Sequence, residues 1–356
     1  MNLTDATRPQ EPKPFVSVII PTYNEQERIE RCLASVLEQD YPVERLEILI
    51  ADGRSTDGTR EKVTAFSDRH PQVRLVDNPK RIQSAAFNLG VREGRGDVII
   101  RLDAHASYGA DYVRRCVEVL AETGAANVGG ECETAPGAET LIARAIAVLC
   151  AQRFGVGGAR FRVGGEAGPV DTVPFGAFPR ATFETAGLLD ERLPRGEDNE
   201  FNARIRQHGL TVWFSPRIRC TYFGRATLGG FMKQLFGNGL YHIKTLRVNP
   251  GGCSVRHFVP LVFVCALLGL GVGGYFWTPA WWFGLGILAL YAVADTAASL
   301  AAARRHGWQY LAVLPWLFFC VHVCYGLGTL AGVVRFALVP QGKRDSRVRD
   351  RAPDED

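Results

Sequence analysis

One short apolar stretch constrains the fold of this chain more than any other feature of its sequence. Residues 98–102 read Val-Ile-Ile-Arg-Leu, and Asp103, Ala104 and His105 follow. Such a β-branched run predicts a buried strand of a parallel sheet, and ligands of these sheets bind just beyond the carboxyl ends of the strands. A carboxylate and an imidazole at that point can share one divalent cation, which in turn can hold a diphosphate. The alternative interpretation is a polar turn that binds nothing.

Strand and helix patterns alternate through the first hundred residues. Strands are predicted at residues 15–20, 46–51 and 73–77, and helices at 29–37 and from about 84 to 91. This alternation is typical of βαβ units. It predicts an α/β fold built on a mostly parallel, doubly wound sheet.

The predicted strands end on polar residues at one edge of the sheet. The first is followed by residues 22–25 and the second by Asp52, and the strand at 98–102 ends at Asp103. Carboxylates at this edge can accept hydrogen bonds from a uracil imide or from ribose hydroxyls. No Gly-x-Gly-x-x-Gly follows the first strand, which argues against a dinucleotide-dependent oxidoreductase. Lys80 and Arg81 precede the next helix, where they either face a pyrophosphate or are simply solvated.

Several motifs in order along the chain resemble those of the inverting family 2 glycosyltransferases, which have the GT-A fold. They are SVIIPTYNE at 17–25, ADGRSTDGT at 51–59, NPKRIQSAAFNLG at 78–90, the strand ending at Asp103, VDTVPFGAFPR at 170–180, GLLDERLPRGEDNEF at 187–201 and the segment 234–241. The resemblance covers roughly residues 15–245. It is greatest to the membrane-bound bacterial enzymes of succinoglycan-type exopolysaccharide assembly, which share the Asp-Ala-His variant and a hydrophobic C-terminal tail.

This resemblance implies a role for individual residues. The residues it assigns to the nucleotide-sugar site are Pro21, Tyr23, Glu25, Asp52, Arg81 and Asp103. Asp103 and His105 match the motif that binds the metal and the diphosphate, although a second aspartate is usual where this chain has His105. The expected cofactor is a divalent metal, Mn²⁺ or Mg²⁺, and imidazole favours Mn²⁺. Because a protonated imidazole cannot bind a metal, we predict that metal-dependent activity falls as the pH drops through about 6.5.

A pair of acids in the second half matches the catalytic base of the family. Glu197 and Asp198 follow Gly196 and open a predicted helix at 199–207. Acids at the positive end of a helix can serve only to cap it and to complement its dipole. The resemblance instead makes Asp198 the base that takes a proton from the acceptor hydroxyl as that oxygen attacks the anomeric carbon. A UDP-α-sugar would then give a β-linkage.

The remaining acceptor-side candidates are less specific. They are Gly176, whose small size lets a sugar approach the backbone, Glu197 and Gln234. Gln234 stands where the family has a Gln-x-x-Arg-Trp-like motif, and the missing arginine and tryptophan argue against a processive cellulose-type synthase. The glycine-rich loop at 155–168 carries Arg160 and Arg162, which either close over phosphates or belong to an ordinary surface loop.

Residues 258–336 are close to continuously apolar. The stretches 258–278 and 281–303 are each long enough to span a bilayer, and a helix at 228–246 is expected along the membrane surface. Arginines before the first span, after the second and in the C-terminal tail all favour the cytoplasmic side. For this reason we expect the third stretch, 308–336, to bend at Pro315 into a re-entrant hairpin. Asp295, inside the second span, is expected to serve helix packing rather than lipid-diphosphate contact.

Composition limits the remaining possibilities. A net charge of +4 is too small to favour nucleic acid as a partner. The nine cysteines show no Cys-x-x-Cys or zinc spacing, which favours a reduced compartment. The N-terminus lacks an apolar core segment, so we expect no signal peptide.

We therefore expect a hexosyltransferase anchored in the bacterial inner membrane, with its catalytic domain in the cytoplasm. It would move a sugar, with glucose suggested, from a UDP-sugar to a lipid-linked saccharide on a polyprenyl diphosphate. The alternatives are a polyprenyl-phosphate glycosyltransferase and a non-catalytic membrane protein with a degenerate nucleotide-binding domain. The expected regions are a disordered tail at 1–14, a GT-A domain at 15–250 divided into a nucleotide-binding half (15–105) and an acceptor half (106–250), a transmembrane region at 257–337 and a charged tail at 338–356.

Overall fold

The computed structural model describes residues 13–337. The predicted tail at 338–356 lies outside the described residues, as does nearly all of the predicted tail at 1–14. Within the described range, nine strands form one sheet in the order β3-β2-β1-β4-β8-β6-β9-β5, with β7 paired to β9. The strands are β1 (Val16–Thr22), β2 (Leu46–Asp52), β3 (Val73–Asp77), β4 (Val98–Arg101), β5 (Ala106–Tyr108), β6 (Asn127–Ala135), β7 (Gly168–Pro169), β8 (Ala177–Pro179) and β9 (Val212–Phe223).

The N-terminal half of the sheet is parallel, as predicted. β1 pairs with β2 and with β4, and β2 pairs with β3. The register sets Thr22 beside Asp52 and Asp52 beside Asp77, so the polar residues that end these strands lie in one row. Beyond β4 the sheet is mixed, because β8 runs antiparallel to β4 and β6, and β9 runs parallel to β6 but antiparallel to β5 and β7.

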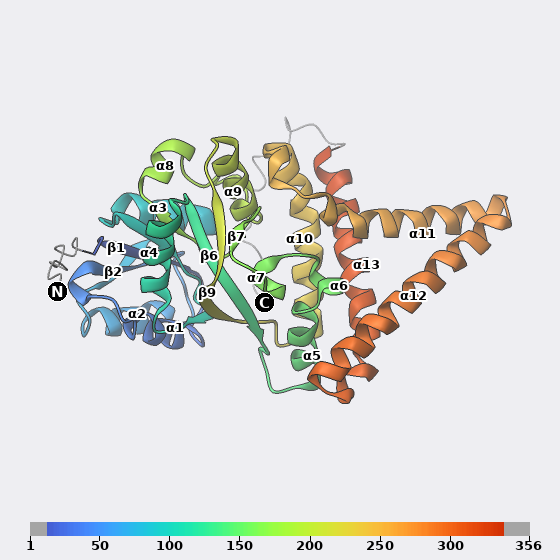
Figure 1. The fold of residues 1–356 in the computed structure, drawn as a ribbon, viewed down its shortest axis with the longest axis horizontal. Helices are drawn as coiled ribbons and strands as arrows, with labels where there is room; N and C mark the ends of the chain where they lie inside the picture. Colours follow the sequence, from blue (N-terminus) through green and yellow to red (C-terminus); the bar gives the residue numbers. More distant parts are fainter. Residues whose placement is uncertain (1–12, 338–356) are drawn as a thin grey trace, which may run out of the picture.

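Helices cover both faces of the sheet (Figure 1). The helices are α1 (Ile29–Leu37), α2 (Thr59–Ser67), α3 (Gln83–Glu93), α4 (Tyr112–Thr123), α5 (Leu141–Cys150), α6 (Arg153–Val156), α7 (Arg160–Val163), α8 (Ala181–Ala186), α9 (Glu197–Gln207), α10 (Leu228–Val248), α11 (Val259–Phe276), α12 (Pro279–His306) and α13 (Leu314–Gly332).

Successive side chains of β1 point to opposite faces of the sheet, and this alternation separates two apolar cores. Val18 and Ile20 pack in the core that contains α1 and α4, whereas Ile19 packs in the core of α3, α8 and α9. In the second core, Phe201 of α9 is 2% exposed and stacks on Phe183 at 5.5 Å. Burial of each such aromatic or aliphatic side chain contributes about 1.5–3 kcal/mol to folding, so both layers fix the strand ends firmly.

The C-terminal apolar region forms three helices that are long and apolar enough to cross a membrane, spanning Val255–Phe276, Pro279–His306 and Leu314–Phe336. α11 and α12 form a hairpin that projects from the rest of the molecule (Figure 1). Its turn contains Trp277 and Trp281, both more than half exposed, as expected of interfacial anchors. Asp295 is buried and accepts a hydrogen bond from Ser299 Oγ one helical turn away, which favours the predicted packing role.

The expected bend at Pro315 is wrong. α13 is continuous, and Pro315 occupies its first turn, where a missing N–H costs no helical hydrogen bond. Residues 308–312 instead form a separate 3₁₀ turn before it.

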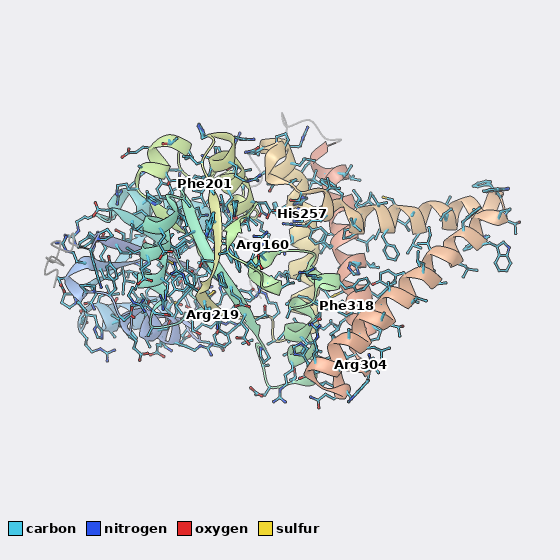
Figure 2. The ribbon with its side chains drawn as sticks, in the orientation of Figure 1. Arg160, Phe201, Arg219, His257, Arg304 and Phe318 are labelled. Atoms are coloured by element: carbon cyan, nitrogen blue, oxygen red, sulfur yellow. The ribbon has the colours of Figure 1, made fainter. Side chains whose placement is uncertain are left out.

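α13 packs along α10, and both share a third apolar core with α5, in which Phe318 of α13 is fully buried (Figures 1 and 2). The predicted surface helix at 228–246 is therefore present as α10, but α13 covers part of it. A methyl group at Gly239 of α10 would lie 2.2 Å from the carbonyl oxygen of Tyr325, and one at Gly328 of α13 would lie 2.2 Å from that of Phe236. The two backbones therefore touch, as small residues allow in membrane helices.

Candidate active site

Asp52 closes β2 and organises the loops at the end of the first two strands. Its carboxylate is fully buried and accepts hydrogen bonds from the backbone N–H of Ser55 (2.9 Å) and from Arg60 Nη1 (2.8 Å). Ser55 Oγ accepts a hydrogen bond from the backbone N–H of Asn24 at 2.8 Å. Pro21 is buried within β1 just before this loop. Asp52 therefore fixes the loops that border the predicted nucleotide site.

Tyr23 and Arg81 meet above Gly53, the residue after β2. A methyl group at Gly53 would lie 3.1 Å from Tyr23 Cδ2 and 3.4 Å from Arg81 Cα. The guanidinium carbon of Arg81 is 6.0 Å from the centre of the Tyr23 ring. Lys80 points elsewhere and forms an ion pair with Glu191 at 2.5 Å. The structure thus gathers Tyr23 and Arg81 beside Asp52 and leaves Lys80 in an ion pair.

His105 lies between two carboxylates. Its Nε2 is 3.8 Å from Asp103 Oδ2, and its Nδ1 is 3.5 Å from Glu25 Oε1. The ring of Tyr222 meets it edge to face at 5.2 Å. Desolvation lowers the pKa of His105, but the contacts with Glu25 and Asp103 outweigh it and the pKa is raised. Desolvation raises the pKa of Glu25, but the contacts with His105 and Arg28 outweigh it, so the pKa of Glu25 is lowered.

Asp103 and His105 fit a divalent cation of the type that nucleotide-dependent enzymes use. Within residues 13–337 no group of three or more His, Cys, Asp or Glu side chains is arranged to hold a metal ion. Two protein ligands nevertheless suffice where waters and substrate phosphates supply the others. Glu25, on the far nitrogen of His105, would fix the orientation of the ring.

Arg101 connects the two halves of the site, and it is not among the residues predicted from the sequence. Its side chain is 6% exposed; Nη1 contacts Asp198 Oδ1, Nη2 lies 3.1 Å from Glu197 Oε1, and Nε lies 3.6 Å from Asp103 Oδ1. A signal was present in the sequence, because an arginine inside an apolar strand must find a partner for its charge. Three carboxylates around one guanidinium bring β4 and the start of α9 together.

Asp198 stands at the N-terminus of α9 after Gly196, which adopts a left-handed φ of +79°. The side chain of Asp198 is 40% exposed, so a substrate can reach it, whereas that of Glu197 is 7% exposed. Desolvation raises the pKa of Asp198, and the charges of Glu197 and Asp103 add to this effect, while Arg101 opposes it. A raised pKa brings a carboxylate closer to the range that suits a general base.

Two acceptor-side candidates have different positions. Gly176 is buried, and a methyl group there would lie 2.2 Å from Asn127 Oδ1, so its small size serves packing against Asn127. Its carbonyl oxygen accepts a hydrogen bond from the backbone N–H of Arg101 at 3.0 Å, and we leave it out of the proposed site. Gln234 of α10 does approach the site, since its Nε2 donates to Tyr222 Oη at 3.3 Å.

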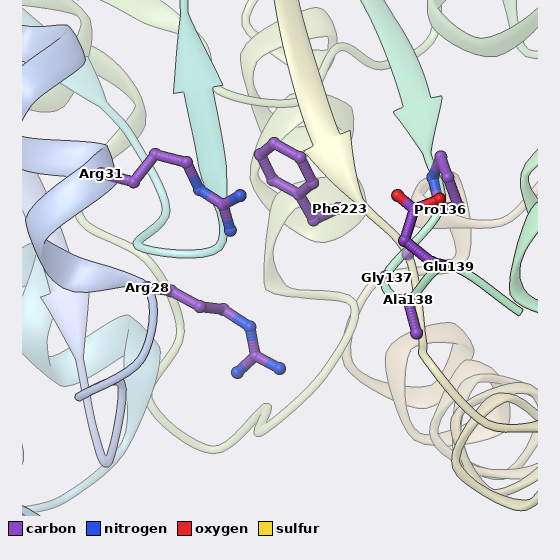
Figure 3. Close-up of a pocket in the computed structure, with 8 residues that line it drawn as sticks. Arg28, Arg31, Pro136, Gly137, Ala138, Glu139 and Phe223 are labelled. Carbon is purple, nitrogen blue, oxygen red and sulfur yellow. The ribbon is translucent and has the colours of Figure 1, made fainter.

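A hollow adjoins the site between α1 and the ends of β6 and β9. Figure 3 shows Arg31 of α1 extending toward Phe223, and Arg28, just before α1, extending into the hollow, with residues 136–139 on the other side. The guanidinium carbon of Arg31 lies 3.8 Å from the centre of the Phe223 ring. Arg28 Nη1 also donates to Glu25 Oε2 at 3.3 Å. The predicted site residues do not line this hollow, but it meets the site through Arg28 and through Phe223, whose backbone N–H donates to the carbonyl oxygen of His105 at 3.2 Å.

Known proteins share both the sequence and the fold of this chain. A family model described as Glycosyl transferase family 2 matches residues 17–186. The Succinoglycan biosynthesis protein ExoA of Rhizobium meliloti is 34% identical over 246 residues, which are 68% of this chain and 74% of that protein. A dolichyl N-acetyl-alpha-D-glucosaminyl phosphate 3-beta-D-2,3-diacetamido-2,3-dideoxy-beta-D-glucuronosyltransferase of Methanococcus voltae is 29% identical over 323 residues, 88% of this chain and 95% of that protein.

Among solved structures, a mannosyltransferase from Pyrobaculum calidifontis, in complex with GDP-Man and Mn²⁺, superposes with a TM-score of 0.58 at 22% identity, over 91% of this chain and 88% of that one. The fold is that of a GT-A glycosyltransferase followed by apolar helices that could span a membrane. The chain belongs to glycosyl transferase family 2 and is a transferase.

Proposed function

We propose that this chain transfers a sugar, with glucose suggested, from a UDP-sugar to a lipid-linked saccharide in the synthesis of a bacterial exopolysaccharide or cell-envelope glycan. The contact of Arg101 with Asp103 on one side and with Glu197 and Asp198 on the other carries this proposal, because it unites the donor and acceptor halves. The relatives support the substrate class, since by name one acts on a dolichyl-linked sugar phosphate and another serves succinoglycan biosynthesis.

In the proposed site, residues at the ends of β1 and β2 bind the nucleotide, and β4 holds the diphosphate. The nucleotide-sugar residues are Pro21, Tyr23, Glu25, Asp52, Arg81 and Asp103. Asp103 and His105 would bind Mn²⁺ or Mg²⁺, which when bound offsets the charge of the diphosphate. The Mn²⁺ in the mannosyltransferase structure supports this choice of cofactor.

Asp198 is the proposed catalytic base. Its carboxylate accepts the proton of the acceptor hydroxyl while that oxygen forms a bond to the anomeric carbon, and the bond from this carbon to the diphosphate oxygen breaks. A single displacement inverts the configuration, so a UDP-α-sugar gives a β-glycoside and UDP. Arg101 orients the carboxylate, and Glu197 shares the same guanidinium.

Replacing His105 by alanine is expected to raise the Mn²⁺ concentration required for half-maximal transfer by at least tenfold, because one of two protein ligands is lost. The requirement is measured by titrating Mn²⁺ and Mg²⁺ into chelator-treated enzyme. His208→Ala, in which the substituted histidine lies just past the end of α9, is the matched control. Unchanged activity of His105→Ala, or of the wild-type enzyme in excess chelator, would remove His105 from the site.

Mn²⁺ affinity is expected to weaken as the pH falls, with a midpoint above 6.5 because the contacts with Glu25 and Asp103 raise the pKa of His105. The affinity falls at low pH because a proton on the imidazole excludes the metal. A raised pKa of His105 moves this competition between proton and metal to higher pH. Electron paramagnetic resonance of free Mn²⁺ between pH 5.5 and 8 gives the affinity directly. A midpoint well below 6.5 would contradict the prediction.

We further propose that the catalytic domain faces the cytoplasm and that the chain divides near residue 257 into a GT-A domain and a membrane region in the bacterial plasma membrane. UDP-sugars are made in the cytoplasm, which supports this orientation. α11 and α12 would cross and return, leaving Arg256 and Arg304 on the same, positive side. α13 packs along α10 rather than along the whole hairpin.

A screen of radiolabelled nucleotide sugars against membrane lipid extracts, with Mn²⁺ and Mg²⁺ compared, tests the proposed function. Transfer of label from one UDP-sugar into an acid-stable glycolipid is the expected result. An acid-labile product would indicate polyprenyl phosphate as the acceptor. Failure to transfer or hydrolyse any nucleotide sugar with metal present would favour a non-catalytic membrane protein.

A further inference from the structure

Three partly buried arginines lie on the side of the site that faces α10. They are Arg162 of α7, Arg195 in the loop before α9, and Arg225 just after β9. In the described part of the chain none of the three forms an ion pair with a carboxylate. By contrast, Arg60 forms ion pairs with Asp52 and Asp77, and Arg101 forms ion pairs with Asp103, Glu197 and Asp198. We call these three residues the arginine cluster.

Tyr222 lies between Arg162 of the arginine cluster and His105. The guanidinium carbon of Arg162 lies 4.9 Å from the centre of the Tyr222 ring, and its Nη1 donates to Thr134 Oγ1 at 2.5 Å. The same ring contacts His105 at 5.2 Å, and its hydroxyl accepts the hydrogen bond from Gln234. Arg162 therefore reaches the site through one aromatic side chain.

The other two members face α10 beside Gln234. Arg195 Nη1 donates to Asn238 Oδ1 at 3.1 Å, and Asn238 lies one helical turn after Gln234, on the same face. Arg225 Nε is buried and has no hydrogen-bond partner in the described structure. A methyl group at Gly230 of α10 would lie 3.9 Å from Arg225 Cδ, so Arg225 also lies against α10. Burial lowers the pKa of Arg195, and the charge of Arg225 lowers it further. The charge of Arg225 also acts on His105.

Partly buried cations without a counter-ion are costly, and an anionic ligand removes that cost. Arginine is suited to phosphate because its planar fork donates two hydrogen bonds in parallel. The donor diphosphate already has Asp103 and His105 just after β4, and Arg81 beside the end of β2. The arginine cluster instead lies toward α10, which packs on the apolar helix α13.

We propose that the arginine cluster binds the phosphate or diphosphate group of the lipid-linked acceptor. The proposal rests on the proposed function, and it adds the position at which the acceptor is held. The anion would be bound beside α10, close to the apolar helices, while the sugar end of the acceptor extends toward Asp198. The acceptor would thereby be oriented by its charged group at one end and by the base at the other.

The test uses the full chain in detergent with farnesyl diphosphate as the probe, after UDP and Mn²⁺ have saturated the nucleotide site. Arg225→Gln and Arg162→Gln are each expected to weaken farnesyl diphosphate binding by at least tenfold and to change the Kd for UDP by less than twofold. The matched control is Arg160→Gln, because Arg160 is in the same short helix, α7, but its Nη1 donates to the backbone oxygen of Glu166. Farnesol, which lacks the anion, serves as the control for binding of the tail.

Unchanged UDP binding shows that each variant is folded. Equal farnesyl diphosphate binding by the wild type and both variants would overturn the assignment, and so would absence of binding by the wild type. A loss of UDP affinity instead would assign the arginine cluster to the donor diphosphate and equally overturn it. Absence of UDP binding by the wild-type chain would contradict the proposed function itself, so the two failures are distinguishable.

Discussion

Asp198→Asn is expected to abolish sugar transfer in practice, with kcat lowered by about 10²–10⁴-fold, the range that a positioned general base contributes. Asparagine has nearly the same shape as aspartate but cannot accept the proton of the acceptor hydroxyl. UDP binding should change by less than about twofold, because Asp198 lies on the acceptor side of Arg101. Turnover and UDP affinity are measured on the same preparation, by product formation and by calorimetry.

Asp111→Asn provides the matched control for this prediction. Asp111 is a partly exposed carboxylate at the start of α4, where it pairs with Arg115, and its loss should leave turnover unchanged. Near-normal turnover of Asp198→Asn would overturn the base assignment. The acids at the start of α9 would then have only the capping role that their position at a helix N-terminus already provides.

Arg101→Met is expected to lower the free energy of unfolding by about 3–5 kcal/mol, the usual cost of removing one partner from a buried ion pair. Methionine fills much of the same volume, so the loss comes mainly from carboxylates left without a counter-charge. Transfer should be lost as well, because Arg101 orients Asp198. The Tm of the purified protein and its transfer activity are the two measurements.

The destabilisation by Arg101→Met should grow with pH. Arg101 opposes the rise in the pKa of Asp198, so its removal lets that pKa rise further above the unfolded value of about 3.9. A carboxylate with a raised folded pKa costs stability once the unfolded chain ionises, so the loss is greater at pH 8 than at pH 5. Arg115→Met, which breaks a partly exposed pair that solvent screens, should destabilise the protein far less than Arg101→Met. A pH-independent Tm difference for Arg101→Met would contradict this account.

The sequence predicted the parallel half of the sheet well because β1, β2 and β4 are strongly apolar and regularly spaced. It did not predict β5 and β8, which have three residues each and pair antiparallel with strands far along the chain. Elements that short carry almost no periodic signal, and their pairing depends on long-range contacts. Pro315 was misread for a related reason, since its effect depends on whether it lies inside a helix or at its first turn.

The sequence located the donor-side residues of the site, but it did not show how Asp198 is joined to them. The ends of strands located Asp52, Asp103 and His105 at one edge, since the carboxyl ends of parallel strands coincide. How Asp198 approaches Asp103 could not be inferred from spacing, because the link is the side chain of Arg101, 97 residues before Asp198 in the chain. The close packing of Gly176 against Asn127 was also hidden, since the two residues lie far apart in the sequence.

The backbone contact between α10 and α13 has a practical consequence for anyone preparing this enzyme. A shortened protein that stops before α11 would expose the face of α10 that contacts α13, including Gly239, and α10 also carries Gln234, which contacts Tyr222. Deleting the hydrophobic C-terminus is therefore expected to yield aggregates and not a soluble catalyst. Purification should retain α13 and use a surfactant or lipid disc that shields it.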